Sequence, residues 1–152
     1  MNKSKFTVVI PAHNEEKYIG KCLKSVISAS KYVAPDCVEI IVVANRCSDK
    51  TCEIAKHYGA RVLINDNKCI AAIRNTGVKA AKGEIVITID ADSMMTKYSL
   101  IEIKEKISKK KIKKVLKIGG YRCQEKVNLL MANDLIIFYK FIMYSKNRCY
   151  YR

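Results

Sequence analysis

The sequence has few of the residues that mark fibrous or disordered chains. Its 152 residues include only six glycines and two prolines, whereas 49% are hydrophobic. Collagen-like, mucin-like and broadly disordered proteins need far more Gly, Pro or Ser and fewer aliphatic residues, so these classes are excluded. A chain of this length and composition is expected to form one folded domain with its own core.

Two common phosphate-binding motifs are missing as well. The sequence contains no G-x-x-x-x-G-K-[ST] and no G-x-G-x-x-G. ATPase and NAD-dependent functions therefore lose the glycine-rich loop that holds their nucleotide. A nucleotide bound by this chain would need a metal ion and basic side chains in its place.

Cysteine pairs and a secretory signal are also absent. The seven cysteines form no C-x-x-C pair, and their odd number leaves one thiol unpaired in any disulfide scheme. We therefore expect neither a zinc site nor a disulfide framework. The only apolar stretch near the N-terminus, Phe6 to Ile10, is too short for a signal sequence. These features predict a cytoplasmic protein in a reducing compartment.

Basic residues outnumber acidic ones, and the excess is uneven. Residues 1–92 hold 14 Lys and Arg against 10 Asp and Glu, whereas residues 93–152 hold 15 against four. Eight lysines and one glutamate fall within residues 104–117, which predicts a solvated helix end and loop. The excess suits nucleic acid, an anionic membrane surface or a polyanionic substrate, and it equally suits a solvated lysine-rich face.

Short apolar runs alternate with amphipathic patterns over the first ninety residues. Asn14 is the expected cap of the first helix, with Glu15 and Glu16 in its first turn. The alternation predicts an α/β fold with right-handed crossovers and a mainly parallel sheet. Strands are expected at 6–10, 38–43, 61–64 and 85–89, with helices after the first three, a helix near 100–107 and a strand at 115–118.

The last part of the chain has a different character. Residues 129–143 are apolar enough to lie on a membrane or a partner, but they are too short and too interrupted by polar residues to span a bilayer. We predict a nucleotide-binding domain over residues 1–125. Residues 126–152 are predicted to form an apolar and basic tail with an interfacial helix.

Polar clusters directly follow three of the expected strands. They are the segments 11–16, 44–46 and 90–92. In an open parallel sheet, ligands bind beyond the carboxyl ends of the strands, so we expect these clusters to converge. Asp90 and Asp92 can hold a hard cation, Mn²⁺ or Mg²⁺, against a phosphate, although a D-x-D triplet is also common in solvated turns. Arg74 can pair with phosphate, or it can be a surface helix arginine.

The residues resemble a known family. FTVVIPAHNEEKYIGKCLKSV, EIIVVANRCSDKT and AAIRNTGVKAAKGEIVITIDAD follow one another in the order and spacing of the nucleotide-sugar-binding part of family 2 glycosyltransferases. The similarity covers about residues 5–107. It implies the GT-A fold, a three-layer α/β/α arrangement with a mainly parallel sheet, incomplete at the C-terminus of this chain.

The resemblance also implies an activity and a site. A sugar would pass from a UDP- or GDP-sugar to an acceptor hydroxyl with inversion, assisted by Mn²⁺ or Mg²⁺. Asn45 stands where the family usually offers an acid to the base, so its amide is expected to hydrogen-bond the base, and Arg74 matches the arginine near the diphosphate. The implied nucleotide-sugar contacts are Pro11, Ala12, His13, Asn14, Glu16, Asn45, Arg74, Asp90 and Ala91, with Asp90 and Asp92 as metal ligands.

No general base can be assigned from the sequence. Family members usually carry an acidic base, often in a Glu-Asp pair, and no such pair follows Asp92. We therefore expect a truncated or inactive form, or one piece of a split enzyme. The basic tail suits a lipid-linked or polysaccharide acceptor of the cell envelope and a peripheral contact with the inner face of the membrane.

Two other functions stay open at this stage. The first is a basic, non-catalytic module that binds nucleic acid or an anionic membrane, although the chain has no recognised RNA or DNA motif and nucleic acid is not the expected partner. The second is a metal-dependent phosphatase, since D-x-D also serves phosphoryl transfer. In phosphatases the pair usually follows the first strand, whereas here it follows the fourth.

Overall fold

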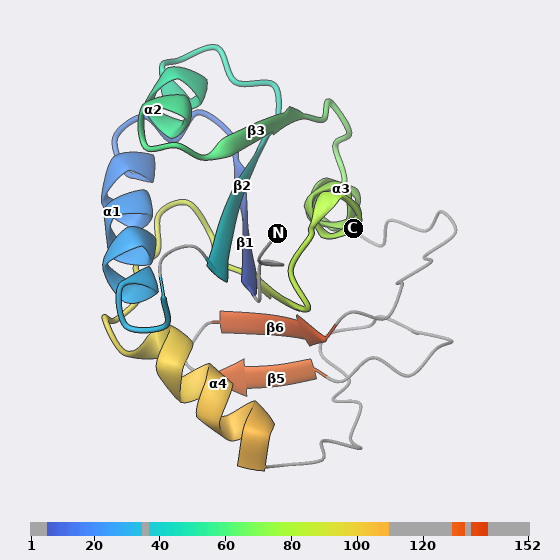
Figure 1. Ribbon diagram of the computed structural model, residues 1–152. Coiled ribbons are helices and arrows are strands. Elements are labelled where there is room, and N and C mark those ends of the chain that lie inside the picture. The colour runs from blue at the N-terminus through green and yellow to red at the C-terminus, as the bar shows by residue number, and fades with distance from the viewer. Residues whose placement is uncertain (1–5, 35–36, 110–128, 133–134, 140–152) are drawn as a thin grey trace.

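The computed structural model describes residues 6–34, 37–109, 129–132 and 135–139 (Figure 1). The elements in chain order are β1 (Phe6–Ala12), α1 (Ile19–Ser30), β2 (Val38–Ala44), α2 (Thr51–His57), β3 (Arg61–Ile64), α3 (Ile70–Ala80), β4 (Ile85–Thr88), α4 (Ser99–Lys109), β5 (Leu129–Ala132) and β6 (Leu135–Tyr139). The strands and helices expected up to residue 107 are all present, with ends shifted by a few residues.

The sheet is mainly parallel, as the sequence predicts. Its strand order is β3-β2-β1-β4-β6-β5. β1 pairs in parallel with both β2 and β4, and β3 is parallel to β2, whereas β6 is antiparallel to β4 and β5 to β6. The chain moves outward from β1 to β3 and then returns to the other side of β1. β1 and β4 therefore flank the point where the strand order reverses, which is the usual ligand site of open α/β sheets.

Two hydrophobic cores cover the two faces of the sheet. Phe6, Val8 and Ile10 of β1 belong to the core shared with α1, α2 and α4, whereas Val9 belongs to the core shared with α3. This alternation follows from the two-residue period of a strand. Figure 1 shows α1, α2 and α4 on one side of the strands and α3 on the other. Both faces are buried, which explains why β1 is a continuous apolar run.

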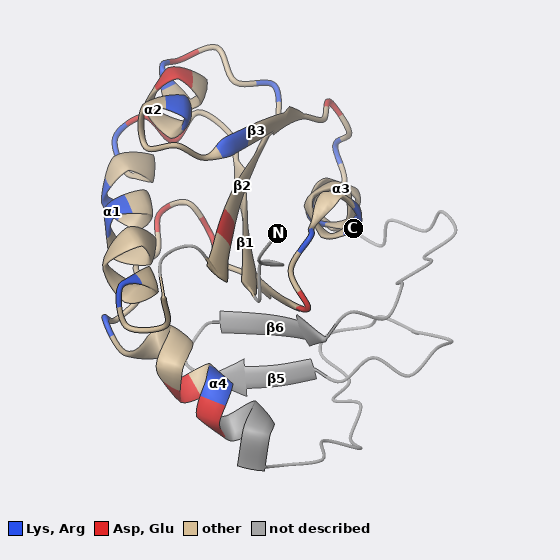
Figure 2. Cartoon of the chain, in the orientation of Figure 1, with Lys and Arg blue, Asp and Glu red and all other residues tan. Residues whose placement is uncertain are grey.

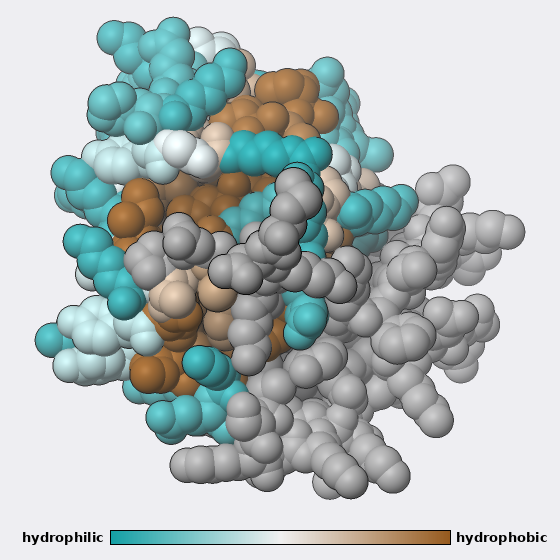
Figure 3. Space-filling model, in the orientation of Figure 1, coloured by the Kyte–Doolittle hydropathy of each residue, from teal (hydrophilic) through white to brown (hydrophobic). Residues whose placement is uncertain are grey.

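Most of the charged residues lie outside the strands of the sheet. Figure 2 shows most charged residues on helices and loops, with one charged position in β2 and one in β3. In Figure 3 hydrophobic atoms lie toward the middle of the described surface and hydrophilic atoms around its outline. In the described ranges, no helix combines the length and apolar character that crossing a membrane requires.

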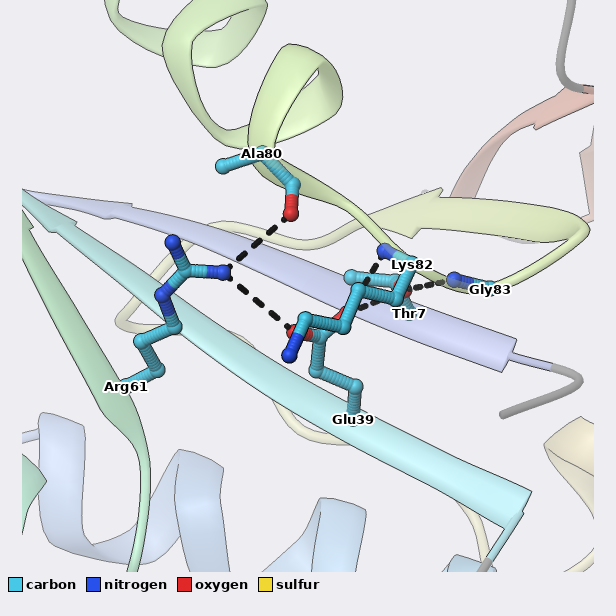
Figure 4. Close-up of polar contacts among 6 residues, drawn as sticks. All are labelled: Thr7, Glu39, Arg61, Ala80, Lys82 and Gly83. Carbon is cyan, nitrogen blue, oxygen red and sulfur yellow. Dashed lines mark hydrogen bonds and ion pairs between the residues drawn. The ribbon is translucent and has the colours of Figure 1, made fainter. Parts of the chain in front are cut away.

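The two charged strand residues take part in a polar cluster at the amino ends of the strands (Figure 4). Glu39 of β2 accepts hydrogen bonds of 2.8 Å from the Thr7 hydroxyl and from the backbone N–H of Lys82, and it pairs with Arg61 of β3 at 3.6 Å. The Gly83 N–H donates to the Thr7 hydroxyl oxygen at 2.9 Å. The cluster fastens the connection between α3 and β4 onto three strands, at the opposite end of the sheet from the polar clusters after β1, β2 and β4.

The predicted cap of α1 is wrong. The helix begins at Ile19, its N-cap is Tyr18, and no side chain caps it. Asn14 instead has a left-handed backbone with φ of 54°, which asparagine tolerates better than most residues. Its side chain accepts a hydrogen bond from the Ser48 N–H at 2.8 Å. Neither Glu15 nor Glu16 lies in the first turn, because residues 13–18 form a longer connection than expected.

The interfacial helix expected within residues 129–143 is also wrong for the residues described there. β5 and β6 form an antiparallel pair, and β6 continues the main sheet along β4. An apolar run of this length fits a buried helix or a strand equally well, and the aliphatic and aromatic residues of LIIFY favour a strand. Pairing with β6 also satisfies the backbone groups on the free side of β4. The strand expected at 115–118 and most of the lysine cluster lie outside the described residues.

The cysteines depart from expectation at one position. Four of the described cysteines, Cys22, Cys37, Cys47 and Cys52, are free thiols. Cys69, which immediately precedes α3, is disulfide-bonded. The sequence predicted no disulfide framework and did not point to a bond at Cys69, since spacing in the sequence does not reveal which cysteines meet in space.

Candidate functional site

A cleft of about 370 Å³ lies at the carboxyl ends of β1, β2 and β4. The three polar clusters that follow these strands meet in it, as the sequence predicts. α3 supplies the remaining wall. The lining residues are Pro11, Ala12, His13, Glu15, Asn45, Arg46, Lys68, Ile70, Ile73, Asp90, Ala91 and Asp92.

The cleft includes most of the predicted site residues, but not all. Asn14 and Glu16 do not line it, and Arg74 reaches it only through Asp90. The site prediction omitted Glu15 and Arg46, although both belong to the polar clusters. Lys68 has no signal in the sequence, because its position depends on how the loop before α3 folds against β2.

Asp90 and Asp92 differ in their partners. The Asp90 carboxylate is 58% exposed and pairs with the Arg74 guanidinium at 2.7 Å. Asp92 is exposed, and among the residues that the structure describes it accepts only a long hydrogen bond, 3.4 Å, from the Ser93 hydroxyl. The Nε of Arg74 is buried and has no hydrogen-bond partner in the described part of the chain. An unpaired buried donor is costly, about 1–3 kcal/mol, so Arg74 is suited to an additional acceptor such as a phosphate oxygen.

Negative charge accumulates at this end of the cleft. Burial, followed by the charges of Asp92, Asp49 and Asp90, raises the pKa of Glu15. Burial, again with the two aspartates of the D-x-D triplet, raises the pKa of the Cys22 thiol to about 12. A bound cation would relieve the repulsion among these carboxylates.

The donor set fits a hard divalent cation that is shared with a ligand. Carboxylate oxygens are the ligands that Mg²⁺ and Mn²⁺ prefer. Over the described ranges, no three His, Cys, Asp or Glu side chains are arranged to hold a metal by themselves. Asp90 and Asp92 would therefore leave several coordination positions open, which suits an ion that also binds phosphate oxygens.

Two loops that border the cleft are fastened to each other. In the connection after β1, the Asn14 side-chain oxygen accepts a hydrogen bond from the Ser48 N–H. The Glu16 N–H donates a hydrogen bond to the Asp49 carboxylate at 3.0 Å. The Glu16 carboxylate accepts one from the Lys50 N–H at 3.1 Å. Asn14 and Glu16 thus hold the neighbouring loop, and their expected contact with the nucleotide stays a prediction.

Asp49 is the centre of this contact. Burial by itself raises the pKa of Asp49, but hydrogen bonds from the Thr51 hydroxyl and from the N–H groups of Thr51 and Glu16 bring it below its ordinary value. The Thr51 hydroxyl oxygen accepts in turn from the Glu15 N–H at 2.8 Å. The ionised carboxylate of Asp49 therefore positions the backbone of Glu15 at the cleft.

Asn45 lines the cleft and also holds the neighbouring loops. Its side chain is buried, and its amide nitrogen donates to the carbonyl oxygens of Asn65 and Asn67. Its amide oxygen accepts from the Arg46 Nε at 3.2 Å, and its backbone carbonyl accepts from the Nδ1 of His13 at 2.6 Å. Both amide N–H groups of Asn45 are therefore used within the protein, whereas its amide oxygen keeps one lone pair at the cleft, and a hydrogen bond from Asn45 to a base stays a prediction.

Comparisons with known proteins agree with this architecture. Residues 7–147 match the model of the family described as glycosyl transferase family 2. The chain is 32% identical over 91 residues to the putative glycosyltransferase EpsH of Bacillus subtilis, covering 57% of this chain and 25% of EpsH. It is 30% identical over 102 residues to the poly(ribitol-phosphate) β-N-acetylglucosaminyltransferase TarS of Staphylococcus aureus, covering 63% of this chain and 18% of TarS.

A solved structure gives the same answer at the level of the fold. The crystal structure of TarS residues 1–349 superposes on this chain with a TM-score of 0.60 at 27% identity, covering 69% of this chain and 32% of that one. The aligned part covers 25% of EpsH and 18% of TarS, and it covers between 13% and 37% of other curated relatives. These matches confirm the resemblance and the GT-A fold class, and none of them supports a nucleic-acid or membrane-binding module.

Proposed function

We propose, from the premise that this chain belongs to glycosyl transferase family 2, that its cleft binds a nucleoside-diphosphate sugar. The sugar would be transferred to an acceptor hydroxyl with inversion. The observation that carries the proposal is the pair Asp90 and Asp92 directly after buried β4, in a cleft at the point where the strand order reverses. An open α/β sheet binds its ligand there.

Different residues of the cleft would hold different parts of the donor. Asp92 and Asp90 would hold Mn²⁺ or Mg²⁺, which supplies Lewis-acid stabilisation of the departing diphosphate. The Arg74 guanidinium, which pairs with Asp90 beside the cleft, would add a positive charge near the diphosphate. Pro11, Ala12 and His13 form the wall of the cleft contributed by β1, between the aspartates and the end of β2.

The proposal assigns no general base. Glu102 and Glu105 lie on α4 and do not line the cleft. The residues that line the cleft therefore support binding of the nucleotide-sugar donor, and donor binding is the property to measure first.

The donor proposal is tested by thermal unfolding with UDP-, GDP- and dTDP-sugars, with and without Mn²⁺. A ligand at 100 times its Kd stabilises the folded state by about 2.7 kcal/mol, which raises the Tm of a chain of this size by about 5–10 °C. We expect such a shift for at least one donor, and only with the metal. A cooperatively unfolding sample that shows no shift with any of these donors would contradict the proposal.

A further proposal concerns acceptor and location. We infer that the acceptor is lipid-linked or a polysaccharide and that the protein works in the cytoplasm at the inner face of the membrane. Its support is the strong excess of Lys and Arg in residues 93–152. The protein is expected to co-sediment with vesicles containing phosphatidylserine at low salt and to be released at high salt. Failure to co-sediment at low salt would remove the membrane contact.

A further inference from the structure

The cleft is polarised along the sheet. Arg46 follows β2 and Lys68 lies in the connection from β3 to α3, so both basic lining residues belong to the β2 and β3 side. Asp90 and Asp92 lie on the β4 side, whereas Glu15 lies in the connection after β1. β1 separates the two ends in the strand order.

Hydrogen bonds within the protein hold the two basic residues at this end of the cleft. Arg46 has a left-handed backbone with φ of 48°, which costs a residue other than glycine about 1–2 kcal/mol. Its Nε is held by the Asn45 amide oxygen at 3.2 Å. The same buried asparagine holds the carbonyl oxygens of Asn65 and Asn67, which fixes the loop that presents Lys68. One buried amide thus places both cations at the cleft.

The orientation of a nucleoside diphosphate follows from this polarity. If its diphosphate lies at the aspartates, as the proposed function requires, the nucleoside must extend toward Arg46 and Lys68. The groups that meet the base are then hydrogen-bond donors, because guanidinium and ammonium groups have no acceptor. Asp90 and Asp92 are at the other end, and the Arg46 Nε already occupies one lone pair of the Asn45 amide oxygen.

We propose that Arg46, with Lys68 beside it, selects the nucleobase of the donor and favours guanine or cytosine over uracil or adenine. Guanine presents O6 and N7 and cytosine presents O2 and N3 as neighbouring acceptors, which a guanidinium contacts with two hydrogen bonds. Uracil places an N–H donor between its two carbonyl groups, and adenine presents an amino group beside N7. The inference rests on the proposed function, since it requires a nucleoside diphosphate in the cleft.

The test measures dissociation constants of GDP, CDP, UDP, ADP and inorganic pyrophosphate by calorimetry in the presence of Mn²⁺. One good two-bond contact is worth about 1–3 kcal/mol of discrimination, so GDP or CDP is expected to bind about 10-fold or more tightly than UDP and ADP. Arg46→Gly removes the guanidinium and suits the left-handed backbone, so the loop keeps its path. In this variant the preference should fall to within about twofold, with pyrophosphate binding unchanged.

The control is Lys31→Met, which removes one positive charge from the exposed residue at the far end of α1. It should leave all five constants unchanged. Tighter binding of UDP by the unaltered protein, or a preference that survives in Arg46→Gly, would overturn the inference while leaving the proposed function intact. An equal loss of pyrophosphate affinity would make Arg46 a phosphate ligand instead. Absence of binding by every nucleotide would contradict the proposed function and the inference together.

Discussion

Replacing Asp92 with asparagine is expected to abolish metal-dependent donor binding and to lower the rate of sugar transfer by about 10²- to 10³-fold. Asparagine keeps the volume of the side chain but removes the charge that faces the proposed metal. Loss of a metal contact of this kind costs several kcal/mol of stabilisation at the departing diphosphate. The measurements are the Mn²⁺-dependent Tm shift with a nucleoside-diphosphate sugar and the rate of sugar transfer.

The effect of Asp92→Asn should be confined to the site. Asp92 is exposed and makes only the 3.4 Å hydrogen bond with Ser93, so the Tm without ligand should stay within about 1 °C. Asp66→Asn is the matched control, because Asp66 is also an exposed aspartate of a loop at this edge and does not line the cleft. It should preserve the metal-dependent shift. A shift that persists in Asp92→Asn would show that Asp92 does not hold the metal.

The sequence was sufficient for those parts of the fold that local patterns determine. β1 and β4 are buried on both faces, so each appears as an almost wholly apolar run, interrupted only by Thr7 in β1 and Thr88 in β4. Because parallel strands bring their carboxyl ends to one edge, the same runs also locate Asp90, Asp92 and His13 in one cleft. The resemblance to the family then supplies the donor chemistry.

The parts that were missed depend on contacts between distant segments. Asn45 lines the cleft as expected, but the sequence does not show that its amide N–H groups bind the carbonyl oxygens of Asn65 and Asn67. Lys68 reaches the cleft through that same loop. β6 joins the sheet because β4 has a free side, and the local sequence does not show which strand is available there.

The change with the largest expected effect on stability is Gly83→Ala. A Cβ atom at Gly83 would lie 2.5 Å from the carbonyl carbon of Phe6 and 2.6 Å from the backbone nitrogen of Thr7. Both neighbours are fully buried backbone in β1, so a rotamer change cannot relieve the overlap. The strand or the α3–β4 connection must move, which strains the hydrogen bond from the Gly83 N–H to the Thr7 hydroxyl. We expect a loss of about 3 kcal/mol or more and a fall in Tm of about 6–12 °C.

Alanine substitutions at two other glycines separate the cost of this steric overlap from the cost of losing the conformational freedom of glycine. Gly59 has φ of +75° and open space around it, so Gly59→Ala should cost only the strain of a left-handed alanine, about 1–2 kcal/mol. Gly20 lies in α1 with its nearest neighbour, the Tyr58 ring, at 3.6 Å from a Cβ, so Gly20→Ala should leave the Tm unchanged or slightly higher. Urea unfolding of the three variants should therefore give the order Gly20, Gly59, Gly83 from most to least stable. If Gly83→Ala were no worse than Gly59→Ala, the close approach of the α3–β4 connection to β1 would be wrong, and with it the account of how the polar cluster at Thr7 and Glu39 fastens that connection to the strands.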